Sequence, residues 1–452
     1  MPSATWRSRV SDALLTRLWP VPLIGVVVAI GAGLGVPALD RAIDDTLPDL
    51  RIISGSTVDD ARELLGTITT AMMTVTSLTF SLTVVTLQLA SGQYSPRLLR
   101  TFARDRFVQT TMALFLATFA YALTVLQNVQ NGPSQTVYTV PHLATAVAAL
   151  LALLSVVGLV FFLAHLVGEI RVETMMHTVC ADAIAAGTDV FQARDPTGEP
   201  EAVPQPPPDA ALVRARSTGF LVSVDAGPLA SAAEQAGAVV FIIRTPGDWL
   251  IAGEPLGYVW LSDSPDPPGA KVLERLNGRV TACVHTGNER TPVQDVGYGL
   301  RQLTDVAVKA LSPGVNDPTT AVHALGYSSA LLCCLVQRRL SYKTLRCGDA
   351  TRVVVRLPSF AELLDMAVAQ PRRYGADDPT VLARLLTLLR EVAWQTTQPE
   401  HRSAIAGQLA RVRRTAAGQN FDEVELAGLA DLGRDVEAVL AGDWRPSVNG
   451  GR

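Results

Sequence analysis

The sequence predicts an α-helical membrane protein with four transmembrane helices and both termini in the cytoplasm. It also predicts a cytoplasmic α+β region containing a small β-barrel-like domain and a helical domain. Composition is the first reason: 48% of the 452 residues are hydrophobic and only 18% are charged, which is less polar than a typical soluble protein. The second reason is four long uncharged stretches in the first 170 residues. The third is the later change to short β-type runs and amphipathic helices.

Four spans are expected at residues 20–39, 66–91, 107–126 and 143–167. Each is long enough to cross about 30 Å of hydrocarbon at about 1.5 Å per residue. The predicted organisation is a four-span domain (1–170), a juxtamembrane helix with a proline-rich linker (171–210), a small β domain (211–288) and a helical C-terminal domain (289–452).

The placement of arginine predicts the orientation of the spans. Arg97, Arg100 and Arg104 lie between the second and third spans, whereas residues 127–142 contain no lysine or arginine. Cytoplasmic loops carry the excess of basic residues. The N-terminus, the arginine-rich loop and everything after the fourth span are therefore expected in the cytoplasm, with the three arginines as a cytoplasmic rim.

The second span carries many hydroxyl groups. At about 100° per residue, it has one apolar stripe and two polar ones. One polar stripe can pack inside the bundle while its hydroxyls bond to carbonyls one turn earlier. The other can line a water-filled path or meet a neighbouring subunit, and the interpretation that both stripes merely pack stays open. The pore-lining candidates are Thr69, Thr76, Thr79, Thr83 and Thr86 on the first stripe and Ser77, Ser81 and Gln88 on the second, which also holds Thr70.

A histidine and carboxylate pattern follows the fourth span. His165, Glu169, Glu173 and His177 recur every four residues, so they share one face of a helix. Such a stripe is a weak candidate for a divalent metal site or a pH sensor. The alternative is a solvated helix face with ordinary pairing between residues four apart.

The cytoplasmic half begins with β-type runs and ends with helices. Strands are expected at 219–224, 238–244 and 249–260, with a helix at 228–236. The hairpin at 246–256 resembles those of small biotinyl-type barrels, but no lysine stands at its tip, so no cofactor is expected. Further helices are expected at 293–310, from Pro318 to about 339, and at 378–395, 402–415 and 422–441, with a strand at 351–357.

The segment LSPGVNDPTTA, residues 311–321, has two interpretations. In the first it is a capped joint between helices, because Pro318 suits the first helical position and Asp317 suits the N-cap. In the second it belongs to a small ligand or ion site. The candidate residues of that site are Asp295, Asp305, Asn316, Asp317 and His323.

Two motifs carry a family resemblance: QLASGQYSPRLLRTFARD at 88–105 and RTPVQDVGYGLRQLTDVAVKALSPGVNDPTTA at 290–321. Through them the chain resembles an uncharacterised bacterial family of predicted membrane proteins, a domain of unknown function. The resemblance covers nearly the whole chain. It implies a bacterial inner-membrane protein with an N-terminal multi-span region and a cytoplasmic C-terminal half, and it implies no activity.

Two classes of function remain. The net charge of −4 argues against a nucleic-acid partner. No nucleophile elbow, phosphate loop, zinc spacing or Rossmann glycine run is present, so no enzyme is expected. The first class is a homo-oligomeric ion channel or pore lined by the second span, with a cytoplasmic regulatory region. The alternative is a membrane-anchored sensor or scaffold whose cytoplasmic half binds a small ligand or a protein. The expected partners are the lipid bilayer, copies of the chain and inorganic ions.

Overall fold

The computed structural model describes residues 19–46, 58–93, 105–130, 142–169, 171–192, 203–262 and 269–445. The chain divides into two compact units, Met1–Arg171 and Val172–Arg452. The predicted rim residues Arg97, Arg100 and Arg104 lie outside the described residues.

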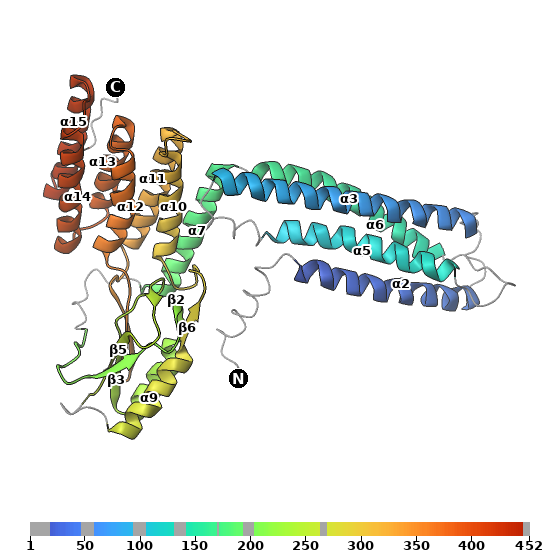
Figure 1. Ribbon diagram of the computed structural model, residues 1–452, viewed down its shortest axis with the longest axis horizontal. Coiled ribbons are helices and arrows are strands. Elements are labelled where there is room, and N and C mark those ends of the chain that lie inside the picture. The colour runs from blue at the N-terminus through green and yellow to red at the C-terminus, as the bar shows by residue number, and fades with distance from the viewer. Residues whose placement is uncertain are drawn as a thin grey trace. The chain divides into compact units, whose positions relative to one another are not determined.

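The first unit is a bundle of long helices (Figure 1). They are α2 (Pro20–Thr46), α3 (Val58–Gln93), α5 (Arg106–Gln130) and α6 (His142–Glu169). Each contains a stretch that is long and apolar enough to cross a membrane. The prediction of four membrane helices is therefore confirmed.

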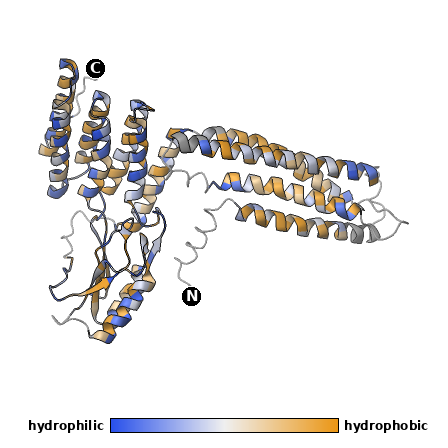
Figure 2. Cartoon of the chain, viewed as in Figure 1, coloured by the Kyte–Doolittle hydropathy of each residue, from blue (hydrophilic) through white to orange (hydrophobic). Residues whose placement is uncertain are grey.

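α5 is the central helix of this bundle and packs against α2, α3 and α6. Its Phe115 and Tyr121 are fully buried. α2 approaches α5 closely at Gly33, where an added Cβ would lie 2.9 Å from Cβ of Thr124. The outward faces of α2 and α6 are apolar (Figure 2), as a lipid-facing surface requires.

α3 begins earlier than predicted, at Val58 rather than near residue 66. Asp59 and Asp60 stand in its first turn, where the helix dipole favours negative charge. The 36 residues of α3 span about 54 Å at about 1.5 Å per residue. Since the hydrocarbon core is about 30 Å thick, α3 is long enough to extend beyond it.

The second unit combines helices with two β-sheets. Its helices are α7 (Val172–Val190), α8 (Ala226–Gln235), α9 (Ala270–Cys283), α10 (Gly297–Ala310), α11 (Pro318–Leu335), α12 (Phe360–Tyr374), α13 (Pro379–Trp394), α14 (Pro399–Ala417) and α15 (Glu423–Ala441). Its strands are β1 (Ala211–Arg214), β2 (Gly219–Val224), β3 (Ala238–Ile242), β4 (Trp249–Leu250), β5 (Pro255–Leu261), β6 (Val284–Gly287), β7 (Tyr342–Cys347) and β8 (Ala350–Arg356).

Neither sheet is a closed barrel, which corrects the barrel-like part of the prediction. The larger sheet has the strand order β1-β5-β3-β8-β7, and the smaller one has the order β4-β2-β6. β3 pairs in parallel with β8, while β2 pairs with β4 and β6. One edge of β3 pairs with β5 inside residues 211–288, but a barrel built from that segment alone would need its other edge to pair there too. Instead, strands from both sides of residue 288 share one sheet.

A hydrophobic core lies between these sheets, α8 and α9. β3 is buried along its whole length, and Leu221 of β2 and Leu276 of α9 are almost fully buried. Because β3 is central in its sheet, it reads as a continuous apolar run rather than an alternating one.

The remaining helices pack with one another. α7 contacts α10 through small residues, since an added Cβ at Gly299 would lie 2.3 Å from Cβ of Ala183. α12 was not predicted, although its N-terminus carries a recognisable signal. Ser359 and Glu362 form a reciprocal capping box there, the arrangement that the spacing S-x-x-E favours.

Candidate functional site

The first hydroxyl stripe of α3 lies on the face that packs inside the bundle. Thr79 is only 1% exposed and Thr86 only 6%. The hydroxyls of all five predicted threonines donate to the carbonyl four residues earlier, at 2.7–2.9 Å: Thr69, Thr76, Thr79, Thr83 and Thr86. Their own helix satisfies them. Thr79 and Thr86 therefore lie inside the chain's own helix bundle and not on its outer surface.

The second polar stripe lies about half a turn around the helix and is exposed along its length: Thr70, Ser77, Ser81 and Gln88. Ser77 and Ser81 donate no hydrogen bond within the part of the chain that the structure describes. Exposed apolar side chains flank the stripe, with Phe80 on one side and Leu78 on the other. A hydroxyl without a hydrogen-bond partner is unfavourable in hydrocarbon. Water or another polypeptide chain would supply partners for the hydroxyls of this stripe.

Asp105, the last residue of the sequence segment 88–105, organises the start of α5. Its Oδ1 accepts from the backbone N–H of Phe107 at 2.8 Å, and its Oδ2 lies 2.5 Å from Nε2 of His165 on α6. Asp105 therefore caps α5 and joins it to α6. His165 has a structural partner that sequence spacing did not suggest.

The predicted histidine and carboxylate stripe does not form one site. His165 belongs to the first unit, whereas Glu173 and His177 belong to the second. Glu173 lies 3.9 Å from His323 at a solvent-exposed position, and His177 packs edge-on to Tyr327. The side chain of Glu169 lies outside the described residues. Among the residues searched, no three potential ligands gather for a metal ion.

The LSPGVNDPTTA segment forms a capped joint. One carboxylate oxygen of Asp317 accepts from the backbone N–H of Thr320 at 3.0 Å, and the other accepts from its hydroxyl at 2.5 Å. These hydrogen bonds lower the pKa of Asp317. Pro318 opens α11, and Asn316 takes a left-handed conformation with φ of 50°. These contacts match the first of the two sequence interpretations.

Asp295 has a different role, far from this joint. It precedes α10 while the joint follows it, and the 14 residues of α10 span about 21 Å. Asp295 is 3% exposed and accepts two hydrogen bonds from Arg290, at 2.7 and 2.9 Å. Burial raises the pKa of Asp295, and the charge of Arg290 opposes that shift. Gly247 packs on the pair, since an added Cβ would lie 2.3 Å from Asp295.

A neighbouring residue, Gln294, joins the segment 290–321 to a β-strand. The side-chain amide of Gln294 accepts from the backbone N–H of Val224 at 2.9 Å and donates to its carbonyl at 3.3 Å. The segment is thus fastened to the end of β2. Asp305 is half-buried on α10 and His323 is exposed on α11. The five predicted ligand residues are therefore not brought together.

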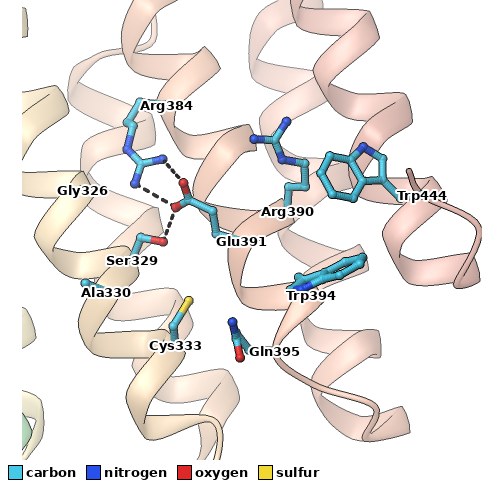
Figure 3. A pocket seen from close by; sticks show the side chains of 10 residues that line it. All are labelled: Gly326, Ser329, Ala330, Cys333, Arg384, Arg390, Glu391, Trp394, Gln395 and Trp444. Carbon is cyan, nitrogen blue, oxygen red and sulfur yellow. Dashed lines mark hydrogen bonds and ion pairs between the residues drawn. The ribbon is translucent and has the colours of Figure 1, made fainter. Parts of the chain in front are cut away.

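A pocket that the sequence did not predict lies between α11 and α13 (Figure 3). At its edge Arg384 donates to both oxygens of Glu391, at 3.2 and 2.9 Å. Ser329 donates to the same carboxylate at 2.5 Å. Burial raises the pKa of Cys333 to about 11, so this lining thiol stays protonated at neutral pH and is a poor nucleophile. No motif signals the pocket, because its walls come from segments far apart in sequence.

Comparison with known proteins agrees with the membrane architecture. A family described as "Predicted membrane protein (DUF2254)" matches residues 16–391. The chain is 35% identical over 425 residues to Uncharacterized protein Mb1321c of Mycobacterium bovis, and equally to Uncharacterized protein Rv1290c of Mycobacterium tuberculosis. Each alignment covers 93% of this chain and 80% of the relative. No solved structure matches the chain at a significant level.

Proposed function

This chain belongs to the DUF2254 family of predicted membrane proteins, and on that premise we propose that it forms a homo-oligomeric ion channel or pore. The exposed stripe of α3, with Ser77, Ser81 and Gln88, faces the path. The buried stripe, with Thr79 and Thr86, holds α3 against α5. The protein is not an enzyme in this proposal, and its second unit regulates the path.

The observation that carries the proposal is the polar, outward face of a membrane-length helix. Ser77 and Ser81 present hydroxyls on the side of α3 that faces away from its own bundle. Exposed Phe80 and Leu78 flank them. In a ring of subunits, apolar flanks make subunit contacts while the hydroxyls face water on the axis.

The path is passive. Residues 64–93 of α3 contain no charged side chain, whereas proton-coupled and ion-coupled transport usually depends on an ionisable group inside the membrane. Hydroxyl and amide dipoles can replace part of an ion's hydration shell without that group.

The orientation follows from the loops. Arg97, Arg100 and Arg104 belong on the cytoplasmic side of a bacterial inner membrane, because basic residues accumulate in cytoplasmic loops. Both termini and the second unit then lie in the cytoplasm, where the second unit can gate the path.

Cysteine substitution with flux measurement tests the proposal. In a background without native cysteines, reconstituted Ser77→Cys and Ser81→Cys variants should react with a charged thiol reagent and change ion flux. Thr79→Cys is the matched control, because its position is only 1% exposed and should stay protected. Liposomes that pass no ions, together with a monomeric particle in detergent, would contradict the proposal. Faster labelling of Thr79→Cys than of Ser77→Cys would reject the assigned face.

The alternative, a membrane-anchored sensor or scaffold, is favoured by one observation. The pocket between α11 and α13 lies in the unit outside the membrane helices. If a ligand bound there while no flux was found in liposomes, the sensor would replace the channel.

A further inference from the structure

The pocket between α11 and α13 has the size and walls of a small-molecule site. Its volume is about 460 Å³, within the range of about 300–1,000 Å³ that such sites occupy. Gly326 and Ala330 of α11 form one wall, and these small residues leave space in front of it. α13 supplies the facing wall, and Trp444, which follows α15, lines a third side (Figure 3).

Two tryptophans shape the apolar part of the pocket. The ring centroids of Trp394 and Trp444 are 5.4 Å apart, and the rings stand at 74° to each other. Trp394 is 60% exposed, which is unusual for so large an apolar side chain on an amphipathic helix. Two indoles in this arrangement form a corner that fits a flat apolar group.

The polar groups of the pocket favour a negative ligand. The lining carboxylate, Glu391, is already occupied, because it accepts from Arg384 and Ser329. Arg390 makes a single 3.3 Å contact with Asp435 and packs over the Trp444 ring at 5.2 Å. Over the described residues, neither lining indole N–H has an acceptor. The two indole N–H groups can therefore donate to a ligand, whereas the carboxylate of Glu391 already accepts hydrogen bonds from the protein.

The charge balance agrees with this chemistry. Two arginines and one glutamate line the pocket, a net charge of +1 that Asp435 balances while it is paired with Arg390. The contact between Arg390 and Asp435 is open to competition, because the Asp435 side chain is 41% exposed. An arginine guanidinium binds a carboxylate through two parallel hydrogen bonds when it can. A ligand carboxylate can offer Arg390 that arrangement.

We infer that this pocket binds a small organic monoanion, a carboxylate carried on a planar aromatic body. Arg390 holds the carboxylate, and Trp394 and Trp444 contact the ring. The inference names the ligand for the sensor alternative above and rests on that alternative alone. If the protein binds the anion but passes no ions, this inference holds and the pore proposal fails. If it passes ions but does not bind the anion, the pore proposal holds and this inference fails.

Isothermal titration of the full-length protein in detergent tests it with three matched probes: 2-naphthoate, the neutral 2-naphthamide and the cationic 2-naphthylmethylammonium. 2-Naphthoate should bind saturably with one site per chain, and the other two at least about tenfold more weakly, as the loss of a charge-assisted hydrogen bond predicts. Empty micelles correct for partitioning into detergent.

Three variants place the site. Arg390→Gln should weaken 2-naphthoate binding about tenfold or more. Arg414→Gln is the control, since it makes the same change at an exposed position on α14 and should change nothing. Asp435→Asn removes the competitor for Arg390 and should tighten binding. It also keeps the inference testable if Arg390→Gln unfolds the protein, because a purely structural Arg390 predicts no tightening.

Three results would overturn the inference. One is the absence of saturable heat with 2-naphthoate. Another is equal or tighter binding of either uncharged or cationic probe. The third is binding that neither Arg390→Gln nor Asp435→Asn alters in a protein whose circular dichroism is unchanged.

Discussion

At the scale of single residues, several polar side chains of the segment 290–321 form structural joints. Asp317 caps α11, Asp295 pairs with Arg290, and Gln294 fastens its loop to β2. Asp317 and Asp295 meet partners three and five residues away in the chain, whereas Gln294 bonds to Val224, 70 residues earlier. Motif residues of this kind maintain the fold, so their substitution should change stability before it changes any activity.

Asp317→Ala should cost about 0.5–2 kcal/mol of unfolding free energy, because it removes an N-cap acceptor. Hydrogen bonds from Thr320 lower the pKa of Asp317 below its ordinary 3.8. Its contribution is therefore complete above that value and is lost as pH falls through the folded-state pKa. Chemical denaturation at a series of pH values measures this difference. Asp377→Ala, at an exposed turn position, is the control and should show no such pH dependence.

Asp295→Ala should be far more damaging, by about 3–5 kcal/mol, because it leaves the charge of Arg290 without its partner in a buried setting. The control is Asp431→Ala. Asp431 pairs with Arg434 at the surface, where both side chains are 66% exposed, and such pairs contribute about 0–1 kcal/mol. Urea denaturation compares the two. An equal loss of unfolding free energy in the two variants would show that the buried pair of Asp295 and Arg290 contributes no more to stability than a surface pair.

At the scale of elements, helix faces decide which surfaces are free. α3 buries one polar stripe and exposes the other, although both look alike in sequence. α2 shows the same distinction among its glycines. Gly33 lies against α5, whereas nothing lies within 4 Å of a Cβ added at Gly31. Two glycines only two positions apart thus differ in packing: Gly33 contacts α5, and Gly31 has open space beside it.

Gly33→Ala should destabilise the bundle by about 1–3 kcal/mol, because its Cβ would overlap Thr124 and force α2 away from α5. Gly31→Ala makes the same chemical change where there is space, so it should leave the thermal midpoint in detergent unchanged or slightly higher. Thermal unfolding monitored by circular dichroism measures both. Equal midpoints for the two variants would disprove the close approach of α2 and α5 at Gly33.

At the scale of the whole molecule, two units have separate cores. The core of the first surrounds α5. In the second, α7 packs on α10 and α11, and an added Cβ at Gly187 would lie 2.8 Å from Leu335. α7 is therefore part of the second unit's packing as well as its link to the last membrane helix.

A fragment of residues 172–452 should fold alone and unfold in one cooperative transition, because it retains its core together with α7. A fragment of residues 203–452 lacks α7, exposes the surface of α10 and α11, and should aggregate. Size-exclusion chromatography and thermal circular dichroism distinguish the two. Equal solubility and stability of both fragments would show that α7 is dispensable for the unit.

Features that depend on local chain properties were predictable from the amino-acid sequence. Hydrocarbon thickness and hydropathy identify a membrane helix from its own residues, so the four spans were predictable. The cap at Asp317 depends on residues three apart. β2 was predicted with its observed bounds because its apolar run is flanked by the polar residues Thr218 and Asp225. The strand β3 was predictable too, but its pairing with β8 was not.

Features that depend on distant segments became visible in the folded chain. β3 pairs with β8, more than a hundred residues later, and this contact replaces a barrel with an open sheet. Packing on α5 selects which polar stripe of α3 is buried. The pocket joins Arg390 with Trp444 through the packing of α13 and α15. Such contacts depend on how whole elements fit together, and no local periodicity encodes that fit.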